Sequence, residues 1–213
     1  RIERFGIACD WQPGYLSLAV NARKARDLQA WHEHMARKYD YRTTWIEPAR
    51  MQHWIASPRF HAGLHDPASG HLHPLKYSLG LGRAAAGLGV RIFENTAVTA
   101  IEPGGTVRVR TEHGSVRASH ALLAGNVYLN GVAPQLEARV MPVGTYIVAS
   151  EPLAPRLCES LIPSRSAVCD TNFVLDYFRP TADHRLLYGG RVSYSTATPP
   201  HLAASMQRRM ART

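Results

Sequence analysis

Alternating apolar and polar positions near the start of the chain predict a strand followed by a helix. Residues 15–20 alternate Leu and Val with Tyr, Ser and Ala, which is the two-residue period of a strand. Asn21 is a favourable helix N-cap, and the apolar residues after it recur at spacings of three and four. The helix should end near residue 39 and bury one face, made of Leu28, Trp31, Met35 and Tyr39.

Further elements follow from the same patterns. A short helix should begin near Pro48, and residues 60–65 predict a strand that ends in a turn at 66–70. Pro74 opens the clearest helix, because proline suits a first helical position, and Gly89 stops it. Strands are then predicted at 90–93, 97–101, 106–111 and 115–118, the last two joined by a hairpin turn at 112–114.

Residues 121–124 differ from these strands because Ala-Leu-Leu-Ala is an unbroken apolar run. Such a run suits a strand covered on both faces in a parallel sheet. Ligands gather at the carboxyl ends of strands in open α/β sheets, so Ala124, Gly125 and Asn126 are candidate ligand contacts. A purely structural turn is the alternative interpretation.

The last third of the chain predicts a mostly antiparallel sheet. Stretches at 141–150, 173–179 and 185–188 are rich in strand-forming residues and are separated by proline-containing loops. Gly189-Gly190 should end this sheet, and residues 200–213 predict a helix. Because antiparallel strands flank a βα-type middle, we expect two interleaved domains of class α/β with α+β.

Composition excludes several classes. The 213 residues are 45% hydrophobic and 19% charged, which is typical of a globular protein, and no apolar run approaches the roughly 18 residues of a membrane span. The net charge is +9, but the basic residues are scattered, which does not favour nucleic-acid binding. Three cysteines without metal or redox spacing favour free thiols in a reducing, cytoplasmic compartment.

Several motifs have competing interpretations. Residues 80–85 match the dinucleotide pattern G-x-G-x-x-A, but they lie inside the helix begun at Pro74, so close helix packing explains the glycines better. Four histidines fall within 61–73 without the spacing of a metal site, so no metal is predicted and a zinc hydrolase is a distant alternative. A phenol and a guanidinium beside a glycine pair, within 177–191, suit an anionic substrate, a flavin edge or ordinary sheet.

Taken together, these segments resemble a known family. The chain is similar to the FAD-dependent amine and amino-acid oxidoreductases of the D-amino acid oxidase, glycine oxidase and sarcosine oxidase family, and most of all to its gamma-glutamylputrescine oxidoreductase group. The matching segments occur in the family's order: 14–18, 65–77, 89–101, 121–126, 141–146 and 177–190.

The resemblance implies a partial FAD-binding, Rossmann-like domain interleaved with an antiparallel-sheet substrate domain. The substrate domain would take 1–72 and 136–198, the FAD-binding domain 73–135, and 199–213 would start a helix returning to the FAD-binding domain. The N-terminal nucleotide-binding βαβ unit of the family is lacking. We therefore expect this piece alone to bind FAD weakly or not at all, because a helix start that holds the pyrophosphate is a major source of affinity.

The resemblance also implies site residues. In the family, the matching positions lie against FAD or face the substrate: Val98, Ala124, Gly125, Asn126, Gly189 and Gly190 for the cofactor, and Tyr177 and Arg191 for the substrate. Some relatives carry another residue where this chain has Arg191. The sequence identifies no catalytic base.

The implied activity is hydride transfer to flavin from the carbon next to a neutral amine. This gives an imine that water hydrolyses to an aldehyde or keto product, and oxygen reoxidises the cofactor with release of hydrogen peroxide. The expected partner is a small amine or amino acid, and the sequence leaves a homodimer open. The alternative is a truncated, non-catalytic fragment or binding module of the same fold that cannot hold FAD.

Overall fold

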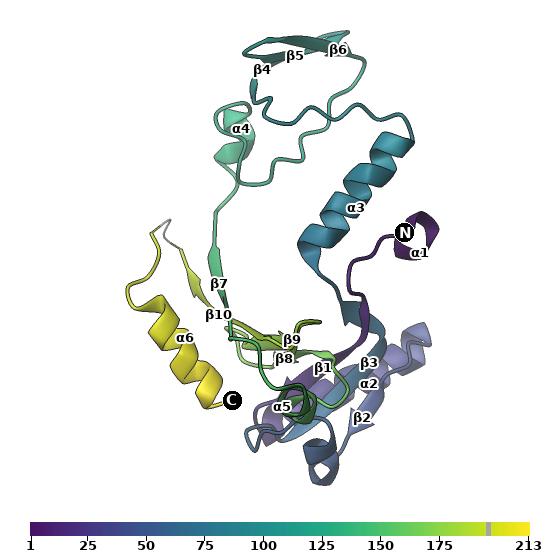
Figure 1. The fold of residues 1–213 in the computed structure, drawn as a ribbon, viewed down its shortest axis with the longest axis vertical. Helices are drawn as coiled ribbons and strands as arrows, with labels where there is room; N and C mark the ends of the chain where they lie inside the picture. The colour runs from purple at the N-terminus through teal and green to yellow at the C-terminus, as the bar shows by residue number, and fades with distance from the viewer. Residues whose placement is uncertain (195–196) are drawn as a thin grey trace. The chain divides into compact units, whose positions relative to one another are not determined.

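The computed structural model describes residues 1–194 and 197–213. The chain divides into two compact units. The first unit contains Arg1–Leu81, Thr145–Ser193 and Ala197–Thr213, and the second contains Gly82–Gly144 with Tyr194. A seven-stranded mixed sheet lies in the first unit and a three-stranded antiparallel sheet in the second (Figure 1).

The seven-stranded sheet has the order β2-β3-β1-β8-β9-β10-β7. Strands β1 and β8 pair in parallel, whereas β1–β3, β2–β3, β8–β9 and β9–β10 pair antiparallel. The strands are β1 Gln12–Ala19, β2 Thr44–Ile46, β3 Ala62–His71, β7 Gly144–Ala149, β8 Ala167–Asp170, β9 Tyr177–Pro180 and β10 Leu186–Ser193. Each predicted strand of the last third overlaps an observed one, but β9 begins only at Tyr177, so residues 173–176 of the prediction are not strand. Strand β8 is one that the sequence pattern did not reveal.

The described chain also contains helices in both units. They are α1 Ile2–Phe5, α2 Ala22–Tyr39, the 3-10 helix η1 Pro48–His53, α3 Pro74–Gly87, α4 Pro134–Glu137, α5 Pro155–Leu161 and α6 Leu202–Ala211. Leu16 and Leu18 are fully buried on one sheet face, together with Met51 of η1 and Met206 of α6. On the opposite face, Ala19 packs in a smaller cluster with α2.

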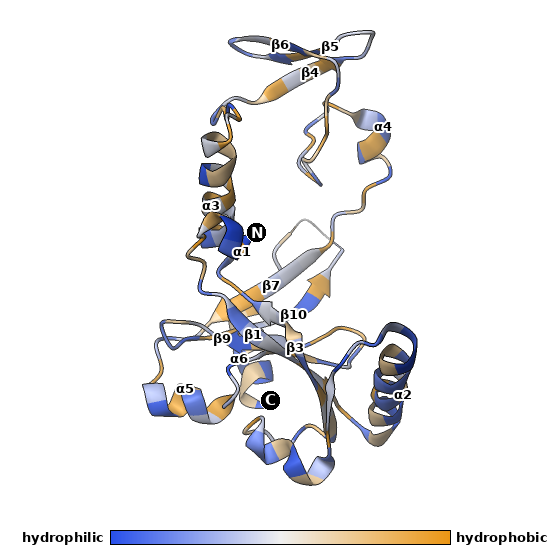
Figure 2. Ribbon diagram, turned by 90° about the vertical axis from the view of Figure 1, so that its right-hand side faces the viewer, coloured by the Kyte–Doolittle hydropathy of each residue, from blue (hydrophilic) through white to orange (hydrophobic). Residues whose placement is uncertain are grey.

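Helix α2 confirms the predicted start and end, but only Leu28 of the predicted buried face packs against the sheet. The Asn21 side chain accepts a hydrogen bond from the Lys24 N–H at 2.9 Å, as an N-cap should. The helix meets the sheet through Ala25 and Leu28. Trp31 and Tyr39 are 44% and 58% exposed, so their predicted burial is wrong, and most of the helix is hydrophilic (Figure 2).

Two glycine-containing segments that predicted chain breaks lie within strands instead. Pro13 pairs with Gly70 and Tyr15 pairs with Asp66, so the predicted turn at 66–70 is an irregularity inside β3. The Asp66 carboxylate accepts the N–H groups of residues 68 and 69 there, which is turn chemistry without a chain reversal. Strand β10 likewise runs through Gly189-Gly190 to residue 193 rather than ending at them.

The second unit contains β4 Val98–Glu102, β5 Val107–Thr111 and β6 Gly114–Ala118, which confirms three predicted strands and their hairpin. The predicted strands at 90–93 and 121–124 are wrong, because neither segment is a strand. Leu122 is 92% exposed. A strand covered on both faces needs hydrogen-bonded neighbours, and the described part of the chain places none beside 121–124.

The glycine-rich segment at 80–85 lies inside α3, as the helix pattern indicated. A Cβ added at Gly80 would come within 2.3 Å of the Ile7 side chain, so this glycine allows close packing against residue 7. No helix in the described ranges is long and apolar enough to cross a bilayer.

Candidate functional site

Four side-chain positions form a row across the seven-stranded sheet. Ser17 pairs with Cys169, Cys169 with Tyr177, and Tyr177 with Gly189. Residues directly opposite one another share a sheet face. The row therefore lies on the face opposite the core formed by Leu16 and its neighbours, and it includes the predicted substrate residue Tyr177.

The glycine pair in β10 is required by its neighbours. A Cβ on Gly189 would lie 2.0 Å from Cε2 of Tyr177, so the phenol ring rests directly on this glycine. A Cβ on Gly190 would lie 2.8 Å from the Asp176 carboxylate. The first glycine thus makes room for the Tyr177 ring, and the second makes room for a buried charge.

The ionisable groups beside Tyr177 are held neutral. Burial, together with a hydrogen bond to Cys169, raises the pKa of Tyr15. Burial also raises the pKa of the Cys169 thiol. Both groups therefore keep their protons at neutral pH, and they give the row hydrogen-bonding groups but no strong base.

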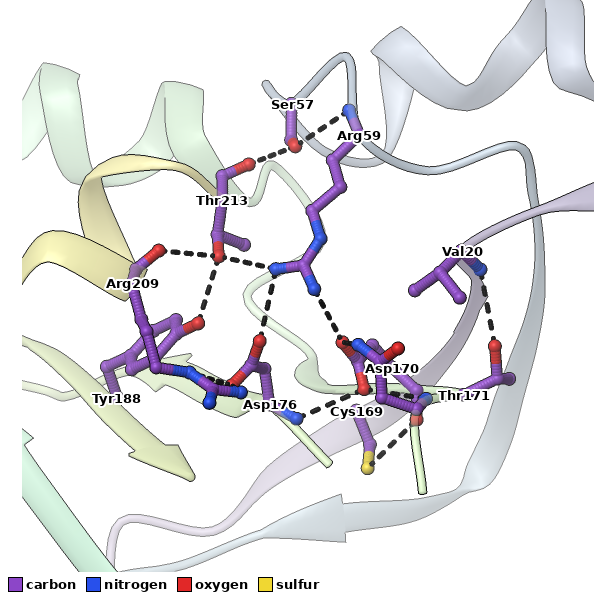
Figure 3. Close-up of polar contacts among 11 residues, drawn as sticks. Val20, Ser57, Arg59, Cys169, Asp170, Thr171, Asp176, Tyr188, Arg209 and Thr213 are labelled. Carbon is purple, nitrogen blue, oxygen red and sulfur yellow. Dashed lines mark hydrogen bonds and ion pairs between the residues drawn. The ribbon is translucent and has the colours of Figure 1, made fainter. Parts of the chain in front are cut away.

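A buried charge network lies next to the row (Figure 3). Asp170 and Asp176 are only 3% and 1% exposed. Arg59 donates to Asp170 at 3.3 Å and to Asp176 at 3.1 Å, and Arg209 of α6 donates to Asp176 at 2.5 Å. Buried carboxylates need such partners, because an unpaired charge in the interior is strongly unfavourable.

The same carboxylates fix the connection between β8 and β9. Asp170 Oδ1 accepts the backbone N–H groups of Asn172 and Asp176, each at 3.0 Å. The Asp170 N–H donates to the Asp176 carbonyl at 2.9 Å. The network therefore holds Cys169 and Tyr177 side by side. Sequence reasoning missed it, although two aspartates that bracket the apolar stretch 173–175 were a usable signal.

Arg191, the second predicted substrate residue, has a positive φ of 59° within β10. Its Nη1 donates to the Ser205 hydroxyl of α6 at 2.5 Å. At least one of its five N–H donors is therefore used to attach α6 to the sheet.

In the second unit, three predicted cofactor residues share one hollow of about 370 Å³. Val98, Ala124 and Gly125 line it together with apolar side chains, whereas Asn126 lies outside the lining. Residues 121–124 belong to no strand, so no sheet ladder of the described chain uses their backbone groups. A planar ring such as adenine is held by apolar side chains against its faces and by backbone hydrogen-bonding groups at its edge. The lining of this hollow fits such a ring.

His71 lines a cavity at the end of the seven-stranded sheet. Its Nε2 donates to the Arg165 carbonyl at 2.9 Å, and its Nδ1 accepts from Arg179 Nη1 at 3.2 Å. These contacts require the neutral ring. Burial, assisted by the charges of the two arginines, lowers the pKa of His71.

Acidification should therefore weaken the fold. Below about pH 6.5 the unfolded chain gains a proton on His71 before the folded chain does, so the free energy of unfolding falls as the pH falls. His71→Asn, which keeps an acceptor for Arg179, should flatten this slope in urea denaturation between pH 7.5 and 5.5. His65, whose pKa burial also lowers, supplies the remaining slope. His113→Asn in an exposed turn is the control, and an unchanged slope in His71→Asn would contradict the assignment.

Comparison with known proteins gives the family. The FAD dependent oxidoreductase (DAO) model matches residues 1–213. The probable oxidoreductase OrdL of Haemophilus influenzae is 39% identical over 197 residues, covering 89% of this chain and 45% of that protein. Gamma-glutamylputrescine oxidoreductase of Escherichia coli is 39% identical over 200 residues, covering 93% and 47%. The chain thus spans about half the length of these curated relatives.

Solved structures show the same fold. Glycine oxidase from Geobacillus kaustophilus matches with a TM-score of 0.76 at 19% identity, over 99% of this chain and 57% of that one. L-proline dehydrogenase from P. horikoshii matches with a TM-score of 0.78 at 17% identity, over 99% and 56%. The mixed and antiparallel sheets thus correspond to part of the fold of these enzymes. Because the family model spans all 213 residues, the chain belongs to the DAO family of FAD dependent oxidoreductases.

Proposed function

We propose that this chain is part of an enzyme that oxidises the C–N bond of a small amine or amino acid with FAD. The observation that carries the proposal is the hollow shared by Val98, Ala124 and Gly125, because it joins two distant segments that the family resemblance assigns to one cofactor. Family membership over the whole chain supports it.

The proposed domains follow the resemblance. Residues 73–135 form the middle of an FAD-binding, Rossmann-like domain, residues 1–72 and 136–198 form the substrate domain, and 199–213 start the returning helix. Since the chain spans about half of its relatives, the rest of the cofactor site belongs to sequence outside it. The chain alone would then hold FAD weakly.

Each site residue has a proposed task. Val98, Ala124, Gly125 and Asn126 hold the adenosine end of FAD, and Gly189 and Gly190 lie near its flavin ring. When bound, FAD accepts the hydride that leaves the carbon next to the amine. Water then hydrolyses the resulting imine.

The substrate side is assigned to the sheet face that carries the row. Tyr177 orients the substrate beside neutral Tyr15 and Cys169. The family resemblance assigns Arg191 to the substrate as well, although its Nη1 donates to Ser205 of α6. Because Tyr15 and Cys169 keep their protons, this face favours an amine that arrives already neutral over one deprotonated by the protein. A glutamyl-substituted amine is the first candidate, since one 39%-identical relative is named gamma-glutamylputrescine oxidoreductase.

The test is anaerobic absorbance spectroscopy on the full-length product of the reading frame that carries this chain. With FAD bound, an amine substrate should bleach the flavin band, and the matched alcohol, which lacks the amine nitrogen, should not. Bound flavin that no amine or amino acid of the panel bleaches would support the non-catalytic binding module instead.

A further inference from the structure

A cavity of about 440 Å³ lies in the first unit, beside the hairpin between β9 and β10. The end of β3, the start of α3 and the hairpin between β9 and β10 contribute to its walls. Trp11, Leu187 and Pro74 give it apolar surface, and Arg179 and Arg165 give it charge. Its volume is within the range of small-molecule sites in proteins.

The charges lining this cavity do not balance. Asp10 is paired with Lys76 at 2.7 Å. Asp183 is paired with Arg185 at 2.9 Å. Among the residues that the structure describes, no carboxylate forms an ion pair with Arg165 or Arg179. Two guanidinium groups therefore line the cavity without a carboxylate at ion-pair distance, although the Asp10 carboxylate, itself paired with Lys76, stabilises the charge of Arg179 from farther away.

Hydrogen bonds hold the Arg179 side chain in place, and they use only some of its N–H groups. It donates to the Leu72 carbonyl at 3.1 Å, to His71 Nδ1 at 3.2 Å and to the Pro180 carbonyl at 3.4 Å. Burial lowers the pKa of this guanidinium, and the charge of Asp10 opposes that shift in part. Three of its five N–H donors are used by neutral groups, and a desolvated cation with neutral partners favours an anion.

Arg165 is the second cation that lines the cavity. Its Nη2 donates to the Thr181 carbonyl at 3.2 Å, and its own carbonyl accepts from His71. Neutral His71 thus bridges the two arginines: it accepts from the Arg179 side chain and donates to the Arg165 main chain. This bridge connects the two arginine residues through neutral groups and adds no negative charge.

We propose that this cavity binds the carboxylate of a small organic acid or amino acid, with Arg179 and Arg165 as the anion-binding residues and Trp11 and Leu187 in contact with the apolar part of the ligand. Arg179 lies two residues along β9 from Tyr177 and on the same face, a separation of about 7 Å. If the proposed function holds, which this step assumes, the cavity fixes the acidic tail of the substrate whose amine reacts beside Tyr177. Carboxylate binding itself does not depend on that function.

Thermal unfolding of the full chain with sodium glutarate tests the proposal. Glutarate should raise the melting temperature with a saturable concentration dependence, because it binds the folded state. Glutaramide, which has the same length without charge, and sodium chloride at equal ionic strength should not. Arg179→Gln and Arg165→Gln should each weaken glutarate binding at least tenfold, and Arg208→Gln on the exposed side of α6 should leave it unchanged.

Three outcomes would overturn the proposal: no glutarate effect on the unmodified chain, an equal effect of glutaramide, or an effect that survives both arginine substitutions. Arg165→Gln keeps the test decisive if Arg179→Gln fails to fold, because the Arg165 side chain has only Thr181 as a hydrogen-bond partner among the described residues. Absence of glutarate binding to the unmodified protein, together with flavin bleaching by an amine, would reject this cavity and leave the proposed function standing. The reverse result would reject the proposed function alone.

Discussion

Arg59→Met should lower the free energy of unfolding by about 3 kcal/mol, the largest stability effect expected from a single substitution. Removing Arg59 leaves the Asp170 carboxylate, whose side chain is completely buried, without a cation and leaves Asp176 with Arg209 alone. Breaking a buried ion pair in this way typically destabilises by roughly 3–5 kcal/mol. The lower end applies because the Arg59 side chain is 29% exposed.

Urea denaturation followed by tryptophan fluorescence measures this effect, since all four tryptophans lie in the first unit. Arg26→Met, on the exposed side of α2, is the matched control and should change stability by no more than about 0.5 kcal/mol. A loss in Arg59→Met as small as that in the control would mean that water already solvates the carboxylates.

Gly189→Ala should lower kcat/KM for the amine substrate by about a hundredfold. The new Cβ would occupy the place of the Tyr177 ring, with 2.0 Å and 2.3 Å to two of its carbons, so the phenol must move. A displacement of about 1 Å in a positioning group can lower a rate a hundredfold. The overpacking should also cost about 1–3 kcal/mol of stability.

A double substitution separates this displacement from general damage. Tyr177→Ala removes the ring, so Gly189→Ala should destabilise that background much less than it destabilises the unmodified protein. Gly82→Ala in α3, where an added Cβ meets nothing within 4 Å, is the control and should stabilise by roughly 0.5–1 kcal/mol. Full activity in Gly189→Ala would show that Tyr177 does not orient the substrate.

The structure shows which sequence patterns were sufficient to predict secondary structure correctly. The strand at 15–20, the capped helix after Asn21 and the hairpin around 112–114 depend on contacts within a few residues, and all three are present. Such patterns reflect interactions between residues close in the sequence, so they predict the element without knowledge of its neighbours in the fold. The helix from Pro74 is correct for the same reason.

The incorrect predictions share a different cause. The apolar run at 121–124 has the composition of a buried strand, but pairing depends on neighbours that the run itself does not specify. Trp31 was assigned to a buried face by spacing alone, although α2 meets the sheet through smaller residues. Gly189-Gly190 suggested a strand end, whereas the glycines accommodate groups from the neighbouring strand and loop.

In the candidate site, too, the sequence revealed local features and missed contacts between distant residues. Tyr177 and the segments around Val98 and Ala124 were recognisable in the sequence, because their residue types and order resemble a family. The buried network of Arg59, Asp170 and Asp176 was not, because its members lie far apart in the chain and are brought together only by folding.

The sequence by itself determined the family resemblance, the local elements and the residues proposed to contact cofactor and substrate, since each depends on residue identity over short stretches. The tertiary structure alone decided that Tyr177 rests on Gly189, that two arginines without an ion-pair partner among the described residues share a cavity, and that Val98 and Ala124 line one hollow. These are contacts between distant segments, and their formation depends on how strands pair and charges find partners in the folded chain.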